Sequence, residues 1–535
     1  MPKIIDKYLM DTGWLFQYRD TLSACPGCSP AGETRCRFCT LCRGLVTGLV
    51  KRLASSIMAA FAHQPNSEKP MPATPPSHTM FDIAIIGAGV VGCALARRLV
   101  LDGARVVVLE KAAELLDGAS KANSAILHTG FDAPPGSLEQ KCVAAGYREY
   151  LEIRESLGLP LLQSGAMVLA WNEAELAALD SLIDKARQNG VADVSRLSRA
   201  QILAREPQLS AGVKGGFLVP GEFLIDPWSS AHSYILQALA NGAEIRRNTE
   251  VLSGRLKGEH WVLETSQGAV CAAQVISCAG LYGDIVDARL LGRAMFRINP
   301  RKGQFVVFDK PAAALVKSII LPVPSKTTKG VVICRTIFGN LLVGPTAEEQ
   351  ESRTDAATEA ATLADLREKG IKMLPALANC EVAASYAGLR PATEYSDFQI
   401  TRHGAQNYIS VGGIRSTGLS AALGIARHVA ALLPATAFRK APVEHPAMVP
   451  ATRLSAYHPR DWEAAGHGGI ICHCELVTKR EIEAALAGPL PPTTLQGLKR
   501  RTRVGMGRCQ GFYCTAALAA LTKGRLVPPI GEEGA

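Results

Sequence analysis

The stretch FDIAIIGAGVVGCALARRLVLDGARVVVLEK, at residues 81–111, constrains the fold more than any other part of this chain. An apolar segment leads into Gly87, Gly89 and Gly92, and a helical pattern follows directly. In this order the first glycine permits a tight turn, the second lets the backbone approach a pyrophosphate, and the third lets helix and strand pack closely. The free amides at the start of the helix then face the phosphates. The motif therefore predicts a dinucleotide-binding β-α-β unit.

A carboxylate stands where such a unit would bind ribose. Glu110 closes the second predicted strand, 23 positions after Gly87, and a carboxylate at that strand end can accept hydrogen bonds from ribose hydroxyls. The glycines could also form a purely structural turn, but the strand, helix and acidic strand end together favour nucleotide binding. The motif alone leaves flavin and nicotinamide open.

Length and composition indicate a globular protein of several folding units. The chain has 535 residues, of which 47% are hydrophobic and 20% charged, as in ordinary globular proteins. The formal net charge of +10 is divided between both ends and the middle, so no domain-wide basic face is expected. We therefore expect no nucleic-acid partner.

The first 79 residues are predicted to form an extension that ends in a linker. Residues 64–79, QPNSEKPMPATPPSHT, contain five prolines, and the first predicted strand begins directly after Met80. We expect residues 1–79 to be disordered or to lie outside the native protein, as after a misassigned start. Their cysteines have spacings that allow a metal site, but we expect them to bind nothing; they are Cys25, Cys28, Cys36, Cys39 and Cys42.

The remaining chain divides into a long α/β part, a connector and a small final domain. Between residues 80 and 433, short β-branched runs alternate with Ala- and Leu-rich helical stretches, which predicts an α/β fold with an additional, more antiparallel layer. A proline-containing connector follows at 434–460, and residues 461–535 form the last domain. No run of 18 apolar residues occurs, so no transmembrane helix is expected. Residues 44–62 could lie on a membrane surface as an amphipathic helix.

Several further sequence segments favour a flavin over a nicotinamide cofactor. The segment DGASKANSAILHTGFDAPPGSLEQKCVAAG resembles the flavoenzymes of the D-amino-acid-oxidase and glycerol-3-phosphate-dehydrogenase superfamily, and so do NTEVLSG, VISCAGLYGD, SYAGLRPAT and VGGIRSTGLSAALGIA. Within it, NSAILHTGF and GSLEQKCVAAG look most like the branch of L-2-hydroxyglutarate dehydrogenase and the large subunit of anaerobic glycerol-3-phosphate dehydrogenase. The resemblance spans residues 80–433. It implies bound FAD and a Rossmann-like FAD-binding domain with an inserted α+β substrate domain.

The same resemblance assigns cofactor contacts. Val251 would touch the adenine through its backbone, and Ala279 with Gly280 would carry a second loop at the dinucleotide. Gly413, Gly418 and Leu419 precede an Ala-rich helix whose amides would point at the pyrimidine end of the flavin, where a helix N-terminus stabilises negative charge. An ordinary capped helix is the alternative. The remaining implied contacts are Lys111, Asn123 and Ser124.

Two side chains are candidates for substrate chemistry. Arg390, in GLRPA, matches an arginine that in this superfamily meets an anionic group; its guanidinium suits carboxylate and phosphate equally. His128, in ILHTGF, matches a position near the reactive ring, where it could take a hydroxyl proton. A structural salt bridge for Arg390 and a merely packing or cofactor-bonding His128 remain open. Arg301, Lys302 and Arg415 could add positive charge to the pocket or lie on the surface.

Four cysteines near the end are predicted to form a ligand set. Cys472 and Cys474 stand in ICHCELVTK, and Cys509 with Cys514 in GRCQGFYC. Four thiolates can bind Zn²⁺ or a [2Fe-2S] cluster. The basic run before Cys509 would suit an anionic cluster, although a solvated basic face is also possible. ICHCELVTKREIEAAL and GLKRRTRVGMGRCQGFYC resemble the bacterioferritin-associated-ferredoxin type of [2Fe-2S] domain. In this part, Thr478 is a predicted cap before a short helix in VTKREIEAAL, and CTAALAALTKG predicts a second helix that ends at Gly524.

Taken together, the resemblances imply an FAD-dependent dehydrogenase acting on a small anionic hydroxy substrate, with a [2Fe-2S] cluster passing electrons onward. Glycerol 3-phosphate is the first expected substrate; a 2-hydroxy acid such as L-2-hydroxyglutarate is the second, and an amino acid or opine the third. The acceptor could be a quinone, a partner subunit or a soluble carrier. An electron-transfer scaffold without its own substrate is the alternative of another class. We expect a cytoplasmic protein, either free or held at the inner face of the membrane through a partner.

Overall fold

The computed structural model describes residues 80–324 and 330–532. The expectations for residues 1–79, including the five early cysteines and the amphipathic segment, lie outside the described residues. The described chain groups into one compact unit, so the domain boundaries near residues 433 and 460 stay predictions. No helix of the described part is long and apolar enough to span a membrane.

The first sheet is built around the predicted dinucleotide motif. Strand β1 pairs in parallel with β2 and β12, β2 with β9, and β12 with β20, while β10, β11 and β19 add antiparallel pairs at the margins. The apolar run at residues 81–86 is wholly buried, as expected for a strand of a covered parallel sheet. The strands are β1 (Phe81–Ile86), β2 (Val106–Leu109), β9 (Glu244–Arg246), β10 (Val251–Lys257), β11 (His260–Thr265), β12 (Gly268–Ser277), β19 (Gln399–His403) and β20 (Tyr408–Gly412).

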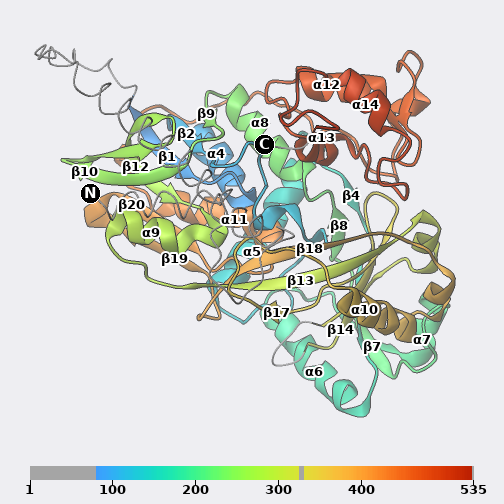
Figure 1. Cartoon of the computed structure of the whole chain (residues 1–535). Helices are drawn as coiled ribbons and strands as arrows, with labels where there is room; N and C mark the ends of the chain where they lie inside the picture. The colour runs from blue at the N-terminus through green and yellow to red at the C-terminus, as the bar shows by residue number, and fades with distance from the viewer. Residues whose placement is uncertain (1–79, 325–329, 533–535) are drawn as a thin grey trace, which may run out of the picture. The chain divides into compact units, whose positions relative to one another are not determined.

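Four helices form the core next to this sheet. Helix α11 (Gly418–Leu432) packs against α4 (Val90–Leu101) and α5 (Leu138–Ile153), and α4 packs against α8 (Ser229–Ala240) (Figure 1). Helices α5 and α11 approach through two glycines: a Cβ on Gly146 would lie 2.2 Å from the Ser420 carbonyl oxygen, and one on Gly424 2.0 Å from that of Cys142. A short helix, α9 (Gly283–Leu291), packs on β10 and β20.

The second sheet is mainly antiparallel and forms the predicted inserted domain. Its order is β17-β13-β16-β15-β14-β5-β7-β6, with β18 also paired to β13; the two long strands β13 and β18 run side by side in Figure 1. The strands are β5 (Ala166–Ala170), β6 (Ser195–Ser198), β7 (Gly215–Val219), β13 (Ile298–Phe308), β14 (Ile319–Pro322), β15 (Val332–Arg335), β16 (Leu341–Gly344), β17 (Glu348–Glu349) and β18 (Val382–Thr393). The same part of the chain contains three helices, which are α6 (Glu173–Gln188), α7 (Arg199–Arg205) and α10 (Ala360–Met373).

A small third sheet carries the histidine segment. It consists of β3 (Ile126–Leu127), β8 (Phe223–Ile225) and β4 (Leu161–Leu162), in the order β3-β8-β4. Strands of two or three residues give almost no periodic signal, so the sequence did not reveal this sheet. Its consequence is that residues near 128 and near 222 lie next to each other.

The C-terminal part has its own small core. Strands β21 (Ile470–Cys472) and β22 (Val477–Thr478) precede α12 (Lys479–Ala487), α13 (Leu495–Thr502) and α14 (Thr515–Leu521). The core includes Val477, Ile482, Leu498 and Leu518, together with Cys472 and Cys514. The helices predicted around residues 479 and 515 are present, but α14 ends before Gly524. The sequence analysis missed α13, although Thr494 is a recognisable cap that accepts from the Gly497 amide.

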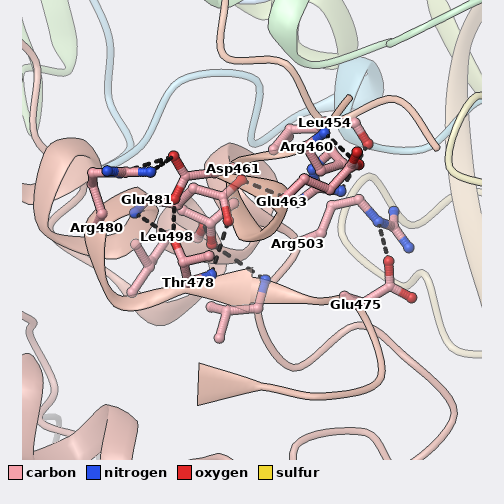
Figure 2. Close-up of polar contacts among 12 residues, drawn as sticks. Leu454, Arg460, Asp461, Glu463, Glu475, Thr478, Arg480, Glu481, Leu498 and Arg503 are labelled. Atoms are coloured by element: carbon pink, nitrogen blue, oxygen red, sulfur yellow. Dashed lines mark hydrogen bonds and ion pairs between the residues drawn. The ribbon is translucent and has the colours of Figure 1, made fainter. Parts of the chain in front are cut away.

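Polar contacts fix the start of α12 to the preceding loop (Figure 2). Thr478 and Glu481 form a reciprocal capping box, in which each side chain accepts from the other's backbone amide. Asp461 contacts both the Thr478 hydroxyl and Arg480, and Arg460 donates to Glu481. The loop before the first cysteine pair is thereby tied to the helix after it.

The close contact of α5 and α11 predicts a stability effect. Gly424→Ala places a methyl group against the Cys142 carbonyl, and such overpacking costs about 1–3 kcal/mol, whereas alanine is otherwise favoured over glycine in a helix by about 1 kcal/mol. We expect a net loss, measured as a lower midpoint in thermal or denaturant unfolding. Gly488→Ala is the control, because its Cβ would make only ordinary contacts. Equal midpoints for the two variants would contradict the packing argument.

Candidate active site and electron-transfer centre

A large cavity lies where the parallel strands of the first sheet end. It measures about 1170 Å³ and is lined by Ile86, Leu109, Cys278 and Val411, which stand at the carboxyl ends of β1, β2, β12 and β20. Parallel strands converge at that edge, which is where open α/β sheets bind ligands. The second sheet contributes residues such as Phe305 and Arg390 to the same cavity.

The glycine turn has the geometry that its sequence predicts. Gly87 has φ +100°, and a Cβ there would lie 2.7 Å from the Cys278 carbonyl oxygen. A Cβ on Gly92 would lie 2.0 Å from the Gly87 carbonyl oxygen, so helix and turn approach too closely for any side chain. Gly89 is the N-cap of α4 and lines the cavity. The start of α4 therefore offers backbone amides to a phosphate.

Glu110 and Lys111 lie beside this turn. Glu110 accepts from the Ala88 amide at 2.7 Å and from the Ala112 amide at 2.8 Å, and burial raises the pKa of its carboxyl. Lys111 Nζ stands 3.3 Å from the ring centroid of Tyr282. Both residues line the cavity. Their positions suit the adenosine half of a dinucleotide.

The segment after β2 wraps the same cavity. Asn123 and Ser124 line it, and Asn123 is held by bonds to the Ser120 carbonyl and the Ala125 amide. The Ser120 hydroxyl accepts from the Val90 amide at 3.0 Å. Ser120, which the sequence analysis did not single out, therefore sits at the start of α4.

The remaining predicted cofactor positions divide into two groups. Val251, Ala279 and Gly280 line the cavity, as do Gly418 and Leu419 in the first turn of α11. In contrast, Gly413 is not a lining residue; it forms a left-handed turn, φ +68°, between β20 and α11. The structure therefore brings every predicted cofactor residue except Gly92 and Gly413 to the cavity wall, and Gly92 instead packs against the Gly87 carbonyl behind the turn.

His128 lies on the cavity wall and contacts a buried glutamate. Its Nδ1 is 2.7 Å from Oε2 of Glu222, whose side chain is 0% exposed. Its backbone amide donates to the Ser420 hydroxyl in the first turn of α11. The sequence analysis missed Glu222, because it is 94 residues from His128 and belongs to no local motif.

Arg390 reaches the cavity from β18. Nη2 donates to the Thr346 carbonyl at 3.2 Å, and Nη1 is buried without a hydrogen-bond partner among the described residues. Burial, aided by the charge of Arg301 directly opposite on β13, lowers the pKa of Arg390 to about 10. Gly303 leaves the space that the guanidinium occupies, since a Cβ there would lie 2.5 Å from Nη2.

The other basic candidates already have partners. Arg301 pairs with Glu349, and Arg415 donates to the Ser396 carbonyl; both line the cavity. Lys302 bonds Glu359 and is not a lining residue. Arg390 is thus the cation of this group that retains an unsatisfied donor.

The four C-terminal cysteines converge as two pairs. Cys472 contacts Cys514, and Cys474 contacts Cys509, so each pair joins one residue from each motif. The Gly505 amide donates to Cys472 Sγ, and backbone amides around Cys509 lower the pKa of its thiol. Cys472 and Cys514 are buried, whereas Cys474 and Cys509 are partly exposed.

This arrangement fits a binuclear cluster. Structural zinc takes four ligands at one ion, whereas four cysteines around two irons supply two thiolates to each. The paired sulfurs therefore suit [2Fe-2S] better than zinc.

The basic run before Cys509 joins the cluster domain to the rest of the unit. Arg501 bonds Glu114, which lies four residues beyond Glu110 and also accepts from the amides of Thr493 and Thr494. Arg500 donates to the Leu115 carbonyl. These contacts are structural; the predicted influence of the cations on cluster potential stays a prediction.

A second set of contacts reaches the antiparallel sheet. Arg503 bonds Glu475, the residue after Cys474, and stacks on Phe338 with 3.9 Å to the ring centroid. Lys310 Nζ is 3.5 Å from Glu475, and Arg508 pairs with Asp309. The cluster domain thus contacts segments that follow strands of both sheets.

Comparison with protein families decides the class. Residues 82–432, well over half of the chain, match the model of the FAD dependent oxidoreductase family. The chain belongs to this family. Residues 470–523 match the model of the BFD-like [2Fe-2S] binding domain. The predicted fold class and the two cofactors, FAD and a [2Fe-2S] cluster, are confirmed.

Individual relatives agree with the family assignment. The chain is 35% identical over 447 residues to a glycerol 3-phosphate dehydrogenase of Caloramator mitchellensis, covering 82% of this chain and 92% of the relative. It is 28% identical to an L-2-hydroxyglutarate dehydrogenase of Indibacter alkaliphilus, covering 50% and 68%. The structure of FAD-bound L-alpha-glycerophosphate oxidase from Mycoplasma pneumoniae superposes with a TM-score of 0.64 at 27% identity, covering 69% of this chain and 97% of that chain.

The cysteine pairing predicts a selective loss of iron. Cys472→Ser removes a buried thiolate ligand, so we expect the purified variant to lose its iron and retain its FAD, measured by iron analysis and flavin absorbance. Cys271→Ser is the matched control, because Cys271 lies on β12 far along the chain from the quartet. Retention of iron by the Cys472 variant, or zinc in place of iron in the parent protein, would overturn the ligand assignment.

Proposed function

We propose that this chain oxidises glycerol 3-phosphate to dihydroxyacetone phosphate and passes the electrons through its [2Fe-2S] cluster to an acceptor. The observation that carries the proposal is the buried Nη1 of Arg390, an unsatisfied donor in the same cavity as His128. Leaving such a donor unpaired costs about 1–3 kcal/mol, and a phosphate oxygen would satisfy it. The relative that matches across 92% of its length is named for this activity.

The residues of the cavity have distinct tasks in this reaction. Arg390 would bind the phosphate through its guanidinium, and the anion would favour the charged form against the desolvation that lowers its pKa. His128 would take the hydroxyl proton from the carbon being oxidised. Residues around the glycine turn and Glu110 would hold FAD, which supplies the acceptor for the hydride and its electron pair. The two thiolate pairs would hold the cluster that carries electrons onward one at a time.

A 2-hydroxy acid is the second candidate substrate. A guanidinium binds carboxylate as well as phosphate, and a relative named L-2-hydroxyglutarate dehydrogenase matches half of this chain. The lower identity and shorter coverage make it the weaker candidate. Amino acids and opines rank third, and a scaffold without a substrate would contain the same cofactors but respond to none of these molecules.

The acceptor and the location are parts of the same proposal. We propose a quinone, a partner subunit or a soluble carrier as acceptor, which the reoxidation rates of the reduced protein by each would distinguish. The cluster's thiolate ligands support a cytoplasmic location, where cysteines stay reduced. Association with the inner face of the membrane would occur through a partner, and sedimentation of the protein with and without membranes tests it.

The substrate assignment predicts a spectral change. Glycerol 3-phosphate added without oxygen should bleach the flavin absorbance of the purified protein, and L-2-hydroxyglutarate should do so less at equal concentration. Preferential bleaching by the hydroxy acid would select the second candidate. No bleaching by any hydroxy acid, amino acid or opine would favour the scaffold.

The role of Arg390 predicts a loss in substrate binding. Hydrogen bonds to charged groups contribute about 1.5–3 kcal/mol, so Arg390→Met should lower kcat/KM by about 10- to 100-fold, mainly through KM. Steady-state kinetics with an artificial dye acceptor measures this. Arg301→Met is the control, because Arg301 is already paired with Glu349. Equal KM values in the two variants would contradict a specific role for Arg390.

A further inference from the structure

The buried carboxylate of Glu222 occupies a position that the family resemblance did not assign. It lies in the turn between β7 and β8, and its side chain is fully buried. Oε1 accepts from both the amide and the hydroxyl of Thr129, at 2.6 and 2.8 Å. Oε2 lies 2.7 Å from His128 Nδ1. Thr129 therefore orients the carboxylate of Glu222, which faces His128.

The surroundings hold this turn in place. Tyr147 donates its hydroxyl to the Gly221 carbonyl at 2.8 Å and stacks on Phe223, with ring centroids 6.0 Å apart. From the other side, the Ser420 hydroxyl accepts from the His128 amide and donates to the Ile126 carbonyl. Both partners of the contact thus sit on backbone that is fixed by neighbouring elements.

This geometry determines which imidazole nitrogen carries the proton. A carboxylate can only accept, so the Nδ1 facing it must donate. In the neutral imidazole, Nε2 is then the nitrogen that can accept a proton. His128 lines the cavity whereas Glu222 does not, so the histidine meets the substrate and the glutamate acts through it.

We propose that Glu222 is a positioning residue that holds His128 in its Nδ1-protonated tautomer and stabilises the imidazolium formed during substrate oxidation. This inference rests on the proposed function. In the step, the substrate O–H bond breaks and its proton moves to His128 Nε2. The C–H bond of the same carbon would break as the carbonyl double bond forms, and FAD, when bound, would supply the acceptor for the hydride. The negative charge of Glu222 faces the positive charge that develops on His128.

Glu222→Gln is the most direct test, because it preserves the shape of the side chain and replaces one accepting carboxylate oxygen with a donating NH2 group. The amide oxygen can still accept from Thr129, but the amide nitrogen would donate to His128 Nδ1 and drive the proton onto Nε2. We expect the rate of flavin reduction at saturating glycerol 3-phosphate to fall by about 10²- to 10⁴-fold, the range for general acid–base catalysis. The substrate dissociation constant from the same anaerobic stopped-flow series should change little.

Two further variants separate positioning from stability. Glu206→Gln is the matched control: Glu206 is also buried and accepts backbone amides, but they are those of Lys317 and Ser318, neither of which lines the cavity. It should reduce its flavin at the parental rate. The double variant Glu222→Gln/His128→Gln should be no slower than His128→Gln alone, because Glu222 acts through His128.

The tautomer of His128 can be measured without turnover of substrate. In protein labelled with ¹⁵N-histidine, the ring nitrogens of His128, assigned by comparison with His128→Gln, should show the Nδ1–H form in the parent and the Nε2–H form in Glu222→Gln. This measurement stands even if glycerol 3-phosphate does not reduce the flavin, an outcome that would count against the proposed function alone. An Nε2–H tautomer in the parent protein would overturn the inference about Glu222. So would a Glu222→Gln variant that reduces its flavin as fast as the parent, or a double variant much slower than His128→Gln.

Discussion

The fold depends on a close backbone approach at the end of β1. Gly87 lies so near the Cys278 carbonyl, and Gly92 so near the Gly87 carbonyl, that no side chain fits at either position. This approach brings the ends of β1, β2 and β12 and the start of α4 to a common edge of the sheet. The Glu110 carboxylate lies at the same edge, where it accepts a hydrogen bond from the Ala88 amide. Without this contact, the strand ends that form the cavity would not converge.

The two arginines that face each other on β13 and β18 lower the local stability of the second sheet. Arg301 and Arg390 are directly opposite on β13 and β18, and like charges in such a pair are destabilising. Glu349 on β17 compensates Arg301, but Nη1 of Arg390 stays unsatisfied inside the protein. Unfavourable charge pairs and unsatisfied donors are retained mainly at functional sites. The Arg301–Arg390 pair therefore supports a binding function more strongly than a basic residue at the surface would.

The sequence predicted those features that are encoded locally. The glycine turn, Glu110, the Thr478 cap and the cysteine pairs each depend on residues close together in the chain, so their spacing carries the signal. Glu222 could not be found in this way, because its link to His128 depends on a three-stranded sheet whose strands are only two or three residues long. The basic run at 499–508 was predicted to lie near the cluster. Its pairing with Glu114, 387 residues from Arg501, is a property of the tertiary fold.

Glu114 lies in the loop after β2 and Lys310 lies shortly after β13, and both contact the cluster domain through buried or half-buried charges. The domain therefore links the chain segments that follow β2 and β13, two strands whose sheets both contribute lining residues to the cavity. Removing the cluster domain from this chain would remove these links together with the predicted redox centre. The relative position of the two cavity walls would then depend on the remaining contacts between the sheets.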